Sequence, residues 1–370
     1  MQNSKIYFPN LNGLRFIAAL MVIIHHNEQI KYIFKLPNYW GSSPFINNVG
    51  RLGVILFFVL SGFLITYLLL AEESSFNRIK IKKFYIRRIL RIWPLYFIIG
   101  VLAFAIFPNI SFLIWPQFPK DVIYNSLILK IFLYISFLPN LSNAFLYIIP
   151  YASQCWSIGT EEQFYILWPI LIRSIKRFRI HMMCLIIFIY IIVKFFTLSE
   201  QNPSVFSLFW INFNIDCMAI GGIFAILLFN KKNILKYILN PYLFYTILLA
   251  TIILISKGVN FGFFQYEVYA LLFGVIIINF ANNTSPALSL ENKPLNYLGK
   301  ISYGLYMYHP ICLVFSLKML SYIGIYNYYT MLFSSVLITI ILASFSYHFI
   351  EAGFIKLKSR FTLIASGNKA

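Results

Sequence analysis

The sequence predicts an all-α, polytopic integral membrane protein with about ten transmembrane helices and both termini in the cytoplasm. The first observation behind this prediction is composition, because 60% of the 370 residues are hydrophobic and only 11% are charged. A soluble domain of this length cannot bury so much apolar surface. The second is a series of apolar stretches of about 18 to 24 residues, the length that crosses a bilayer as a helix. We expect one membrane domain over residues 1–370, with its core at 8–351 and a basic cytoplasmic tail at 352–370.

The placement of charge predicts the orientation of the chain. The formal net charge is +19, which taken alone is compatible with nucleic-acid binding. The basic residues, however, gather in short segments beside the apolar spans, as the positive-inside rule describes. We therefore place these segments in the cytoplasm and expect no nucleic-acid partner. The four basic clusters are Arg78 to Arg91, Arg173 to Arg179, Lys231 to Lys236 and Lys356 to Arg360.

Ten crossings satisfy this orientation, because an even number puts both termini on the same side. The segment 122–139 is apolar enough to be a further helix, but it carries Lys130 near its centre. Counting it as a span would move the cluster from Arg173 to Arg179 outside, so we expect a re-entrant or interfacial element on the outer face. The first span lacks a small-residue cleavage site after it and is expected to be retained. The predicted spans are 14–33, 50–71, 92–110, 155–172, 181–198, 207–229, 237–256, 264–282, 301–320 and 328–350.

The first span carries two polar side chains that a membrane helix rarely keeps without a use. Arg15 and His26 are separated by ten residues, which places them about 16 Å apart along a helix. A titratable imidazole at bilayer depth indicates a functional site. The alternative is an arginine that reaches the interface beside a pair of structural histidines, His25 and His26.

The basic segment before the third span is a candidate anion-binding surface. Arg87, Arg88 and Arg91 occupy positions i, i+1 and i+4. Arg87 and Arg91 are therefore expected to share a helical face that grips phosphates through the forked donors of the guanidinium group. The alternative role is topology determination or attraction to anionic lipid.

The start of the fourth span carries adjacent carboxylates, Glu161 and Glu162, just after Trp156 and Ser157. These residues are compatible with a simple capping and dipole feature at a helix entry. Burying either carboxylate costs several kcal/mol unless it is paired, which favours a functional role.

Two further polar residues lie within predicted spans. Asp216 is close to Gly221 and Gly222, small residues that permit close helix packing. His309 is followed by Pro310, which frees a backbone carbonyl within the helix. Each is compatible with a functional or a structural hydrogen-bonding role. The four cysteines are scattered without the spacing of a zinc site or a disulfide framework, so no metal is expected.

Five segments occur in a set order along the chain. They are NLNGLRFIAALMVIIHH at 10–26, GVILFFVLSGFLIT at 53–66, FYIRRILRIWPLYF at 84–97, WSIGTEEQFYILWP at 156–169 and LGKISYGLYMYHP at 298–310. Together they resemble the acyltransferase-3 family of bacterial membrane O-acyltransferases, which includes O-antigen and exopolysaccharide O-acetylases. The resemblance covers about residues 8 to 351, nearly the whole chain.

This resemblance implies roles for individual positions. The family's R-x10-H spacing falls on Arg15 and His26, and the glutamate of its W-S-L-x-x-E pattern falls on Glu161. Its paired cytoplasmic arginines fall on Arg87 and Arg88.

Three positions depart from the family pattern. Ile158 replaces the usual leucine, and Asn12 replaces the usual aspartate before a glycine. His25 adds a second imidazole, which leaves open whether His25 or His26 acts.

The resemblance implies acyl transfer, acetyl foremost, from a coenzyme A thioester on the cytoplasmic side of the bacterial plasma membrane. The acceptor would be a hydroxyl of a cell-envelope saccharide or of a lipid-linked glycan. A histidine base suits this reaction near neutral pH, so His26 would take the acceptor proton. Glu161 would hold the imidazolium or bind a sugar hydroxyl. No permanently bound cofactor is expected.

The remaining candidates have supporting roles in this interpretation. The phosphates of the donor would be neutralised by four basic residues, Arg15, Arg87, Arg88 and Arg91. Substrate binding or support is expected from Trp156, Ser157, Asp216 and His309.

Two other interpretations remain open from the sequence. The first is a glycan or proton-coupled transporter or flippase, in which His26, Glu161, Asp216 and His309 form a proton relay. The second is a catalytically silent relative that acts as a partner protein. Direct transfer and a route through an acyl-histidine are equally compatible with the motifs.

Overall fold

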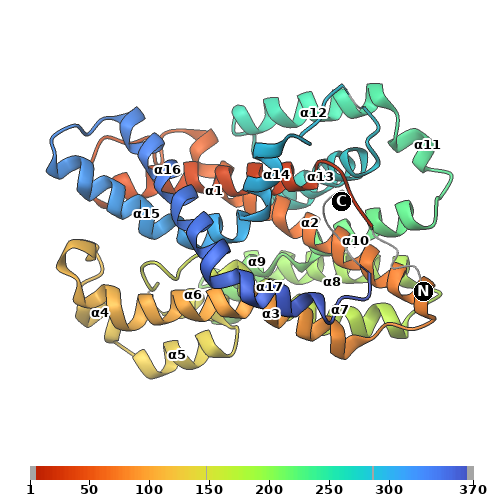
Figure 1. Ribbon diagram of the computed structural model, residues 1–370, viewed down its shortest axis with the longest axis horizontal. Coiled ribbons are helices and arrows are strands. Elements are labelled where there is room, and N and C mark those ends of the chain that lie inside the picture. The colour runs from red at the N-terminus through yellow and green to blue at the C-terminus, as the bar shows by residue number, and fades with distance from the viewer. Residues whose placement is uncertain (1–5, 147, 286, 365–370) are drawn as a thin grey trace.

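The computed structural model describes residues 6–146, 148–285 and 287–364, and helices dominate all three ranges (Figure 1). Within them the only extended pairing is an isolated bridge between Trp115 and Phe118. The short elements are π-helical at η1 (Leu102–Ile106) and η5 (Tyr347–Glu351), and 3-10 at η2 (Phe107–Asn109), η3 (Ser111–Leu113) and η4 (Gly262–Phe264). The α-helices are α1 (Leu11–Ile33), α2 (Pro44–Phe76), α3 (Ile81–Val101), α4 (Lys120–Tyr124), α5 (Leu127–Ile135), α6 (Pro139–Phe145), α7 (Cys155–Ser174), α8 (Arg179–Leu198), α9 (Val205–Phe213), α10 (Ile215–Phe229), α11 (Leu235–Ile238), α12 (Pro241–Ser256), α13 (Gln265–Asn282), α14 (Lys293–Lys300), α15 (Ser302–Tyr322), α16 (Tyr328–Ser346) and α17 (Ala352–Ser359).

The structure confirms an all-helical protein with several helices that can span a membrane. Six segments of the described chain are long and apolar enough to cross a bilayer, and each overlaps a predicted span. The count of ten stays a prediction, because the other four predicted spans correspond to α1, α7, α12 and α15, which are shorter or more polar. The six segments are Pro44–Phe76, Ile81–Asn109, Arg179–Leu198, Val205–Phe229, Gly262–Asn282 and Tyr329–Ser359.

The segment 122–139 does not form a continuous helix. It is divided between α4 and α5 by a break at Asn125 and Ser126, and α5 has only 9 residues. A helix that crosses the hydrocarbon core needs about 20. Lys130 is buried, and its ammonium donates hydrogen bonds of 3.1 Å to the carbonyls of Val122 and Ile123 in the last turn of α4. These carbonyls solvate the charge, so the segment tolerates a central lysine as a folded-back pair of short helices.

The long helix α2 is the centre of the bundle. It packs against α1 and α10, and 72% of its most apolar window is buried inside the protein, against 28% for α8 and for Tyr329–Ser359. Two glycines bring α2 and α10 together: a Cβ added to Gly62 would lie 1.9 Å from the Met218 carbonyl oxygen, and one added to Gly221 would lie 2.2 Å from that of Val59. The expected close packing at Gly221 is therefore confirmed. Small residues at a helix crossing permit this backbone approach.

Three of the four basic clusters meet at the C-terminal end of α2. Glu72 forms an ion pair of 3.0 Å with Arg87, and Glu73 forms one of 2.5 Å with Arg179. Arg87 also donates a hydrogen bond of 3.1 Å to the Phe361 carbonyl, which joins the C-terminal cluster to the same place. Figure 1 shows α11, beside the fourth cluster, at one end of the bundle and α4 with α5 at the other. This clustering at one end agrees with the positive-inside interpretation, and the compartment itself stays a prediction.

The expected basic tail begins as an ordered helix. Residues 352–359 form α17, which continues from α16 through the π-helical turn η5 and packs along α3 (Figure 1). The sequence analysis did not predict this helix.

Candidate active site

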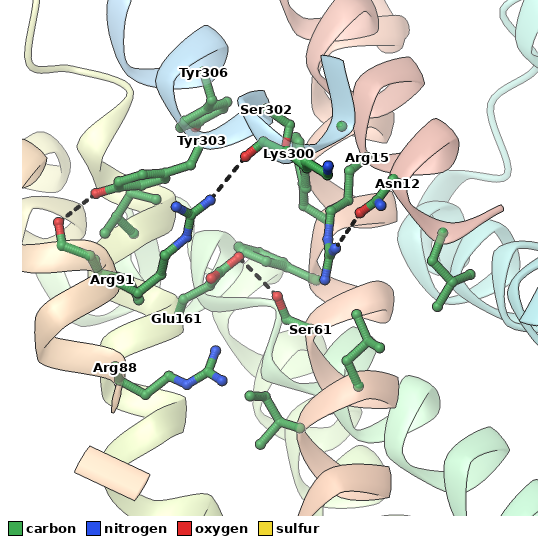
Figure 2. A pocket seen from close by; sticks show the side chains of 18 of the residues that line it. Asn12, Arg15, Ser61, Arg88, Arg91, Glu161, Lys300, Ser302, Tyr303 and Tyr306 are labelled. Carbon is green, nitrogen blue, oxygen red and sulfur yellow. Dashed lines mark hydrogen bonds between the residues drawn. The ribbon is translucent and has the colours of Figure 1, made fainter. Parts of the chain in front are cut away.

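A cavity of about 580 Å³ opens among α1, α2, α3, α7, α15 and α17, and it gathers five of the ten predicted site residues (Figure 2). Its lining combines apolar side chains of α2 with charged and phenolic groups from the other helices. The charged residues that line it are Arg15, Arg88, Arg91, Glu161, Lys300 and Lys358.

Arg15 is held in this cavity by the way α1 begins. Asn10 adopts a left-handed conformation (φ 66°) at the N-cap of α1, and its side-chain oxygen accepts a hydrogen bond of 2.7 Å from the Leu290 amide. The Asn12 oxygen then accepts a hydrogen bond of 3.1 Å from Arg15. Asn12 stands where the family pattern has aspartate, and it orients the guanidinium group without neutralising it. The positive charge of Arg15 thus remains available to a ligand.

The face of α3 that reaches the cavity differs from the predicted one. Arg88 and Arg91 line the cavity, whereas Arg87 points to Glu72 and to the Phe361 carbonyl. The orientation of α3 turns Arg88 and Arg91, and not Arg87, toward the cavity, so the expected shared face of Arg87 and Arg91 does not line it. Donor binding by Arg87 stays a prediction. Arg91 contacts the Lys300 carbonyl at 3.1 Å, and the buried Nε of Arg88 has no hydrogen-bond partner among the described residues.

Glu161 is the one carboxylate among the residues that line this cavity. It accepts hydrogen bonds from the Tyr165 hydroxyl at 2.6 Å and from the Ser61 hydroxyl at 3.3 Å. Figure 2 shows it between Arg15 on one side and Arg88 with Arg91 on the other. Glu161 is therefore placed with the cationic groups, and its hydrogen bonds fix its position there.

A second group of polar contacts closes the cavity at the N-terminal end of α7. The hydroxyls of Ser157 and Tyr306 lie 2.7 Å apart, and the Tyr306 hydroxyl donates to the Gln154 carbonyl at 2.9 Å. Both Ser157 and Tyr306 line the cavity.

Three histidine rings form a cluster next to this wall. His26 stacks on His309 with ring centroids 5.0 Å apart, and His25 meets His26 edge to face at 5.0 Å. His26 Nδ1 lies 2.6 Å from the Gln29 side-chain oxygen, and His309 Nδ1 lies 2.6 Å from the Tyr306 carbonyl. Both partners can only accept, so each ring carries its proton on Nδ1 and has a lone pair on Nε2.

Tyr306 connects the cavity to the histidine cluster. Its hydroxyl and ring belong to the cavity lining, its carbonyl binds His309, and the two rings have centroids 5.7 Å apart. His309 in turn stacks on His26. A ligand that passes Tyr306 from the cavity would therefore approach the two stacked imidazoles.

Comparison with known proteins identifies the family. A family model described as an acyltransferase domain matches residues 8–347. The chain belongs to the acyltransferase-3 family. All five segments that carried the resemblance contribute to the cavity of this family member, through Arg15, Ser61, Arg88, Glu161 and Tyr303 among others.

Curated relatives of this acyltransferase-3 member have names that refer to O-acetylation. O-acetyltransferase OatA of Staphylococcus aureus strain NCTC 8325 is 29% identical over 94% of this chain and 57% of its own length. A protein of Staphylococcus aureus strain COL, provisionally named an O-acetyltransferase, is 29% identical over 95% of this chain and 58% of its own length. The chain thus spans less than two thirds of the relatives that it matches. No solved structure matches the chain.

Besides Arg87, four predicted residues of this acyltransferase-3 member lie outside the cavity lining: His26, His309, Trp156 and Asp216. His26 and His309 lie in the histidine cluster, so Glu161 and His26 do not share a hydrogen bond in this structure. The expected contact between Glu161 and the imidazolium is therefore absent among the described contacts. Trp156 packs under the guanidinium group of Arg51, whose carbon lies 4.2 Å from the ring centroid.

Asp216 belongs to a separate buried cluster between α8, α10 and α13. It is fully buried, next to an ion pair of 2.6 Å between Lys194 and Glu267, and it interacts electrostatically with both residues. This position makes Asp216 part of the packing of three helices.

The sequence analysis missed two cations of the cavity, Lys300 and Lys358. Lys300 lies inside one of the quoted segments, two residues after Leu298. Lys358 comes from α17, where Ile355 and Lys358 are three residues apart and both face the cavity. The helical spacing of apolar and basic residues in this tail would have indicated an amphipathic helix here.

Proposed function

We propose that this acyltransferase-3 member transfers an acyl group, acetyl first of all, from a coenzyme A thioester to a hydroxyl of a cell-envelope saccharide or lipid-linked glycan. The observation that carries the proposal is the cationic cavity whose wall, Tyr306, contacts the histidine cluster. The O-acetyltransferase names of the relatives support the acetyl group. We place the protein in the bacterial plasma membrane, with the cavity open to the cytoplasm.

The lining of the cavity suits a donor that carries several phosphates. Arg15 and Arg88 present forked donors that match phosphate oxygens in pairs, and Lys300 adds a compact charge. Charge-assisted hydrogen bonds of this kind are stronger than neutral ones. The apolar side chains Phe57 and Phe58 of the lining offer contacts to the less polar arm of the donor. The acyl end would then lie toward Tyr306.

His26 is the proposed general base. Its Nδ1 proton is held by Gln29, which leaves Nε2 to accept the proton of the attacking hydroxyl. The hydroxyl oxygen forms a bond to the thioester carbonyl carbon, and the bond from that carbon to sulfur breaks. The thiolate that leaves takes the proton from the imidazolium, so proton and electron pair are balanced.

His309 is the proposed positioning residue for His26. The rings are stacked at 5.0 Å, and the Tyr306 carbonyl fixes the tautomer of His309. A fixed ring below His26 limits its rotation and keeps Nε2 in one direction.

Glu161 has a different role in this proposal from the one expected at first. Its carboxylate lies among the arginines of the cavity, held by Ser61 and Tyr165. There it separates Arg15 from Arg88 and can accept a hydrogen bond from a hydroxyl or amide of the donor. We therefore propose that Glu161 binds the donor and affects the rate of acyl transfer by positioning the thioester.

The acceptor is proposed to approach from the opposite side of the membrane. Trp156 and Ser157 stand at the N-terminal end of α7, where the Ser157 hydroxyl lies 2.7 Å from that of Tyr306 and the adjacent Cys155 sulfur lies 3.4 Å from the hydroxyl of Tyr134 in α5. An aromatic ring next to polar groups suits a sugar, which presents both apolar and hydroxyl faces. Asp216 would support the packing behind this region.

The test is transfer of labelled acetyl from acetyl coenzyme A by the purified protein in liposomes that contain a lipid-linked glycan acceptor. We expect label in the acceptor or, without acceptor, slow hydrolysis, and we expect neither with His26→Ala. Glycan movement or proton flux without consumption of acetyl coenzyme A would contradict the proposal and favour a transporter. Inactivity of the wild-type protein toward every thioester, with correct folding, would favour a silent partner protein.

A further inference from the structure

The cationic cavity has a wall that lies outside the part of the chain matched by the family. The match ends at residue 347, whereas α17 begins at Ala352. Ile355 and Lys358 of α17 both line the cavity. The cavity is thus completed by a helix that the family resemblance does not cover.

Contacts at both ends hold α17 in this position. At its start, Glu351 forms an ion pair of 3.2 Å with Arg91 of α3. Just after its end, the Phe361 carbonyl accepts a hydrogen bond of 3.1 Å from Arg87. The helix packs along α3 between these points (Figure 1). These two attachments fix which face of α17 meets the cavity.

That face carries one lysine inward and leaves its neighbour outside. Lys358 is half-buried in the cavity wall, whereas Lys356 is exposed and does not line the cavity. Among the described residues, no carboxylate or hydrogen-bond acceptor contacts the Lys358 ammonium. Four cations, Arg15, Arg87, Arg88 and Arg91, lie within electrostatic reach of it.

The gathering of these cations in one cavity is electrostatically unfavourable when no anion is bound. Five cations and one carboxylate line the cavity, and of these five cations only Arg91 has an ion-pair partner, Glu351, among the described residues. The repulsion between partly buried like charges is only weakly screened by salt. An anion with several negative charges relieves it, and one with a single charge relieves less of it. The lining therefore matches a ligand with at least two phosphate groups.

We propose that Lys358 is a phosphate-binding residue and that α17 completes the donor site, so that the site selects a polyphosphate-bearing thioester. The inference rests on the proposed function for the identity of the donor. It adds a residue and a structural element to that site, and it explains why the cavity has more cations than the motifs supply.

The experiment measures binding by isothermal titration calorimetry to the full-length protein in lipid nanodiscs. The ligands are coenzyme A, which carries the phosphates, and pantetheine, which carries none. Loss of one charge-assisted contact is expected to weaken coenzyme A binding about tenfold or more in Lys358→Gln. Lys358→Arg should retain most of the affinity. Pantetheine should bind Lys358→Gln and wild type equally, which a merely misfolded variant would not do.

Lys356→Gln is the matched control, because it removes the same charge from the same helix outside the cavity. It should bind coenzyme A as wild type does. Wild-type affinity of Lys358→Gln for coenzyme A, or equal weakening in Lys356→Gln, would overturn the inference.

A different result would overturn the proposed function instead. If the wild-type protein does not bind coenzyme A, the proposed donor is wrong. The phosphate-binding role of Lys358 is then tested with inorganic pyrophosphate as the ligand. The inference requires pyrophosphate to bind Lys358→Gln more weakly than Lys356→Gln. Equal binding to the two variants, or no binding at all, contradicts it.

Discussion

The imidazole ring of His26 stacks on that of His309, with centroids 5.0 Å apart and planes inclined by 29°. Stacked imidazoles repel each other when both are charged, so at most one of them accepts a proton at a time. His309 is fully buried and its Nε2 has no partner among the described residues. His26 is less buried than His309, and the Nδ1 atoms of both rings are bound to an oxygen acceptor. The Nε2 of His26 is therefore the more accessible of the two lone pairs.

His26→Ala should abolish acyl transfer, with a loss of roughly 100-fold to 10,000-fold in rate, because it removes the general base. His25→Ala should retain a measurable rate. The His25 ring binds the Ile46 carbonyl at 2.6 Å and packs on Gly50, so it serves the contact between α1 and α2. The measurement is acetyl transfer in liposomes, with membrane insertion checked for both variants. Equal loss of activity in the two would mean that the base is assigned to the wrong ring.

Arg88→Ala should raise the KM for the donor about tenfold or more and leave the KM for the acceptor nearly unchanged. The reason is that Arg88 lines the cavity and its buried Nε is without a partner among the described residues, so a phosphate is its expected acceptor. Arg78→Ala is the control, because Arg78 is an exposed member of the same basic cluster. A larger change in the KM for the acceptor would move the donor site away from α3.

Arg87→Ala should lower the free energy of unfolding clearly and change the affinity for the donor little. Its partner Glu72 has a side chain only 3% exposed, and removing Arg87 leaves that carboxylate without its ion pair. Breaking a buried pair in this way costs about 3 kcal/mol or more. The thermal midpoint in detergent should fall in Arg87→Ala and recover in part in the double variant with Glu72→Gln. No recovery would show that the contact of Arg87 with Phe361, and not the ion pair, provides the stability.

The predicted orientation can be tested by cysteine labelling in a Cys184→Ser background, because the other three cysteines are buried. A membrane-impermeant maleimide should label Asn125→Cys, between α4 and α5, in intact cells. It should label Lys232→Cys, near the start of α11, only after permeabilisation. Both positions are exposed in the structure. The reverse pattern would invert the topology and place the cationic cavity outside.

Much of the fold follows from the apolar pattern of the sequence. Apolar stretches of sufficient length become helices in a bilayer because no other local structure satisfies the backbone there. Lys130 correctly indicated that 122–139 is not a simple span, and the structure divides the segment into α4 and α5. The end of the chain was harder to predict, because α17 has only 8 residues and is held by contacts with α3.

The sequence by itself determined that this is a helical membrane protein of the acyltransferase-3 family, and it supplied Arg15, Arg88, Arg91 and Glu161 as candidates for one site. Only the tertiary structure decided that Arg88 and not Arg87 faces the cavity, and that Lys358 joins it. The physical reason is that sequence spacing fixes where side chains lie on their own helix, whereas the rotation of each helix toward its neighbours depends on packing. Here that rotation is set by ion pairs such as those of Arg87 with Glu72 and Arg91 with Glu351.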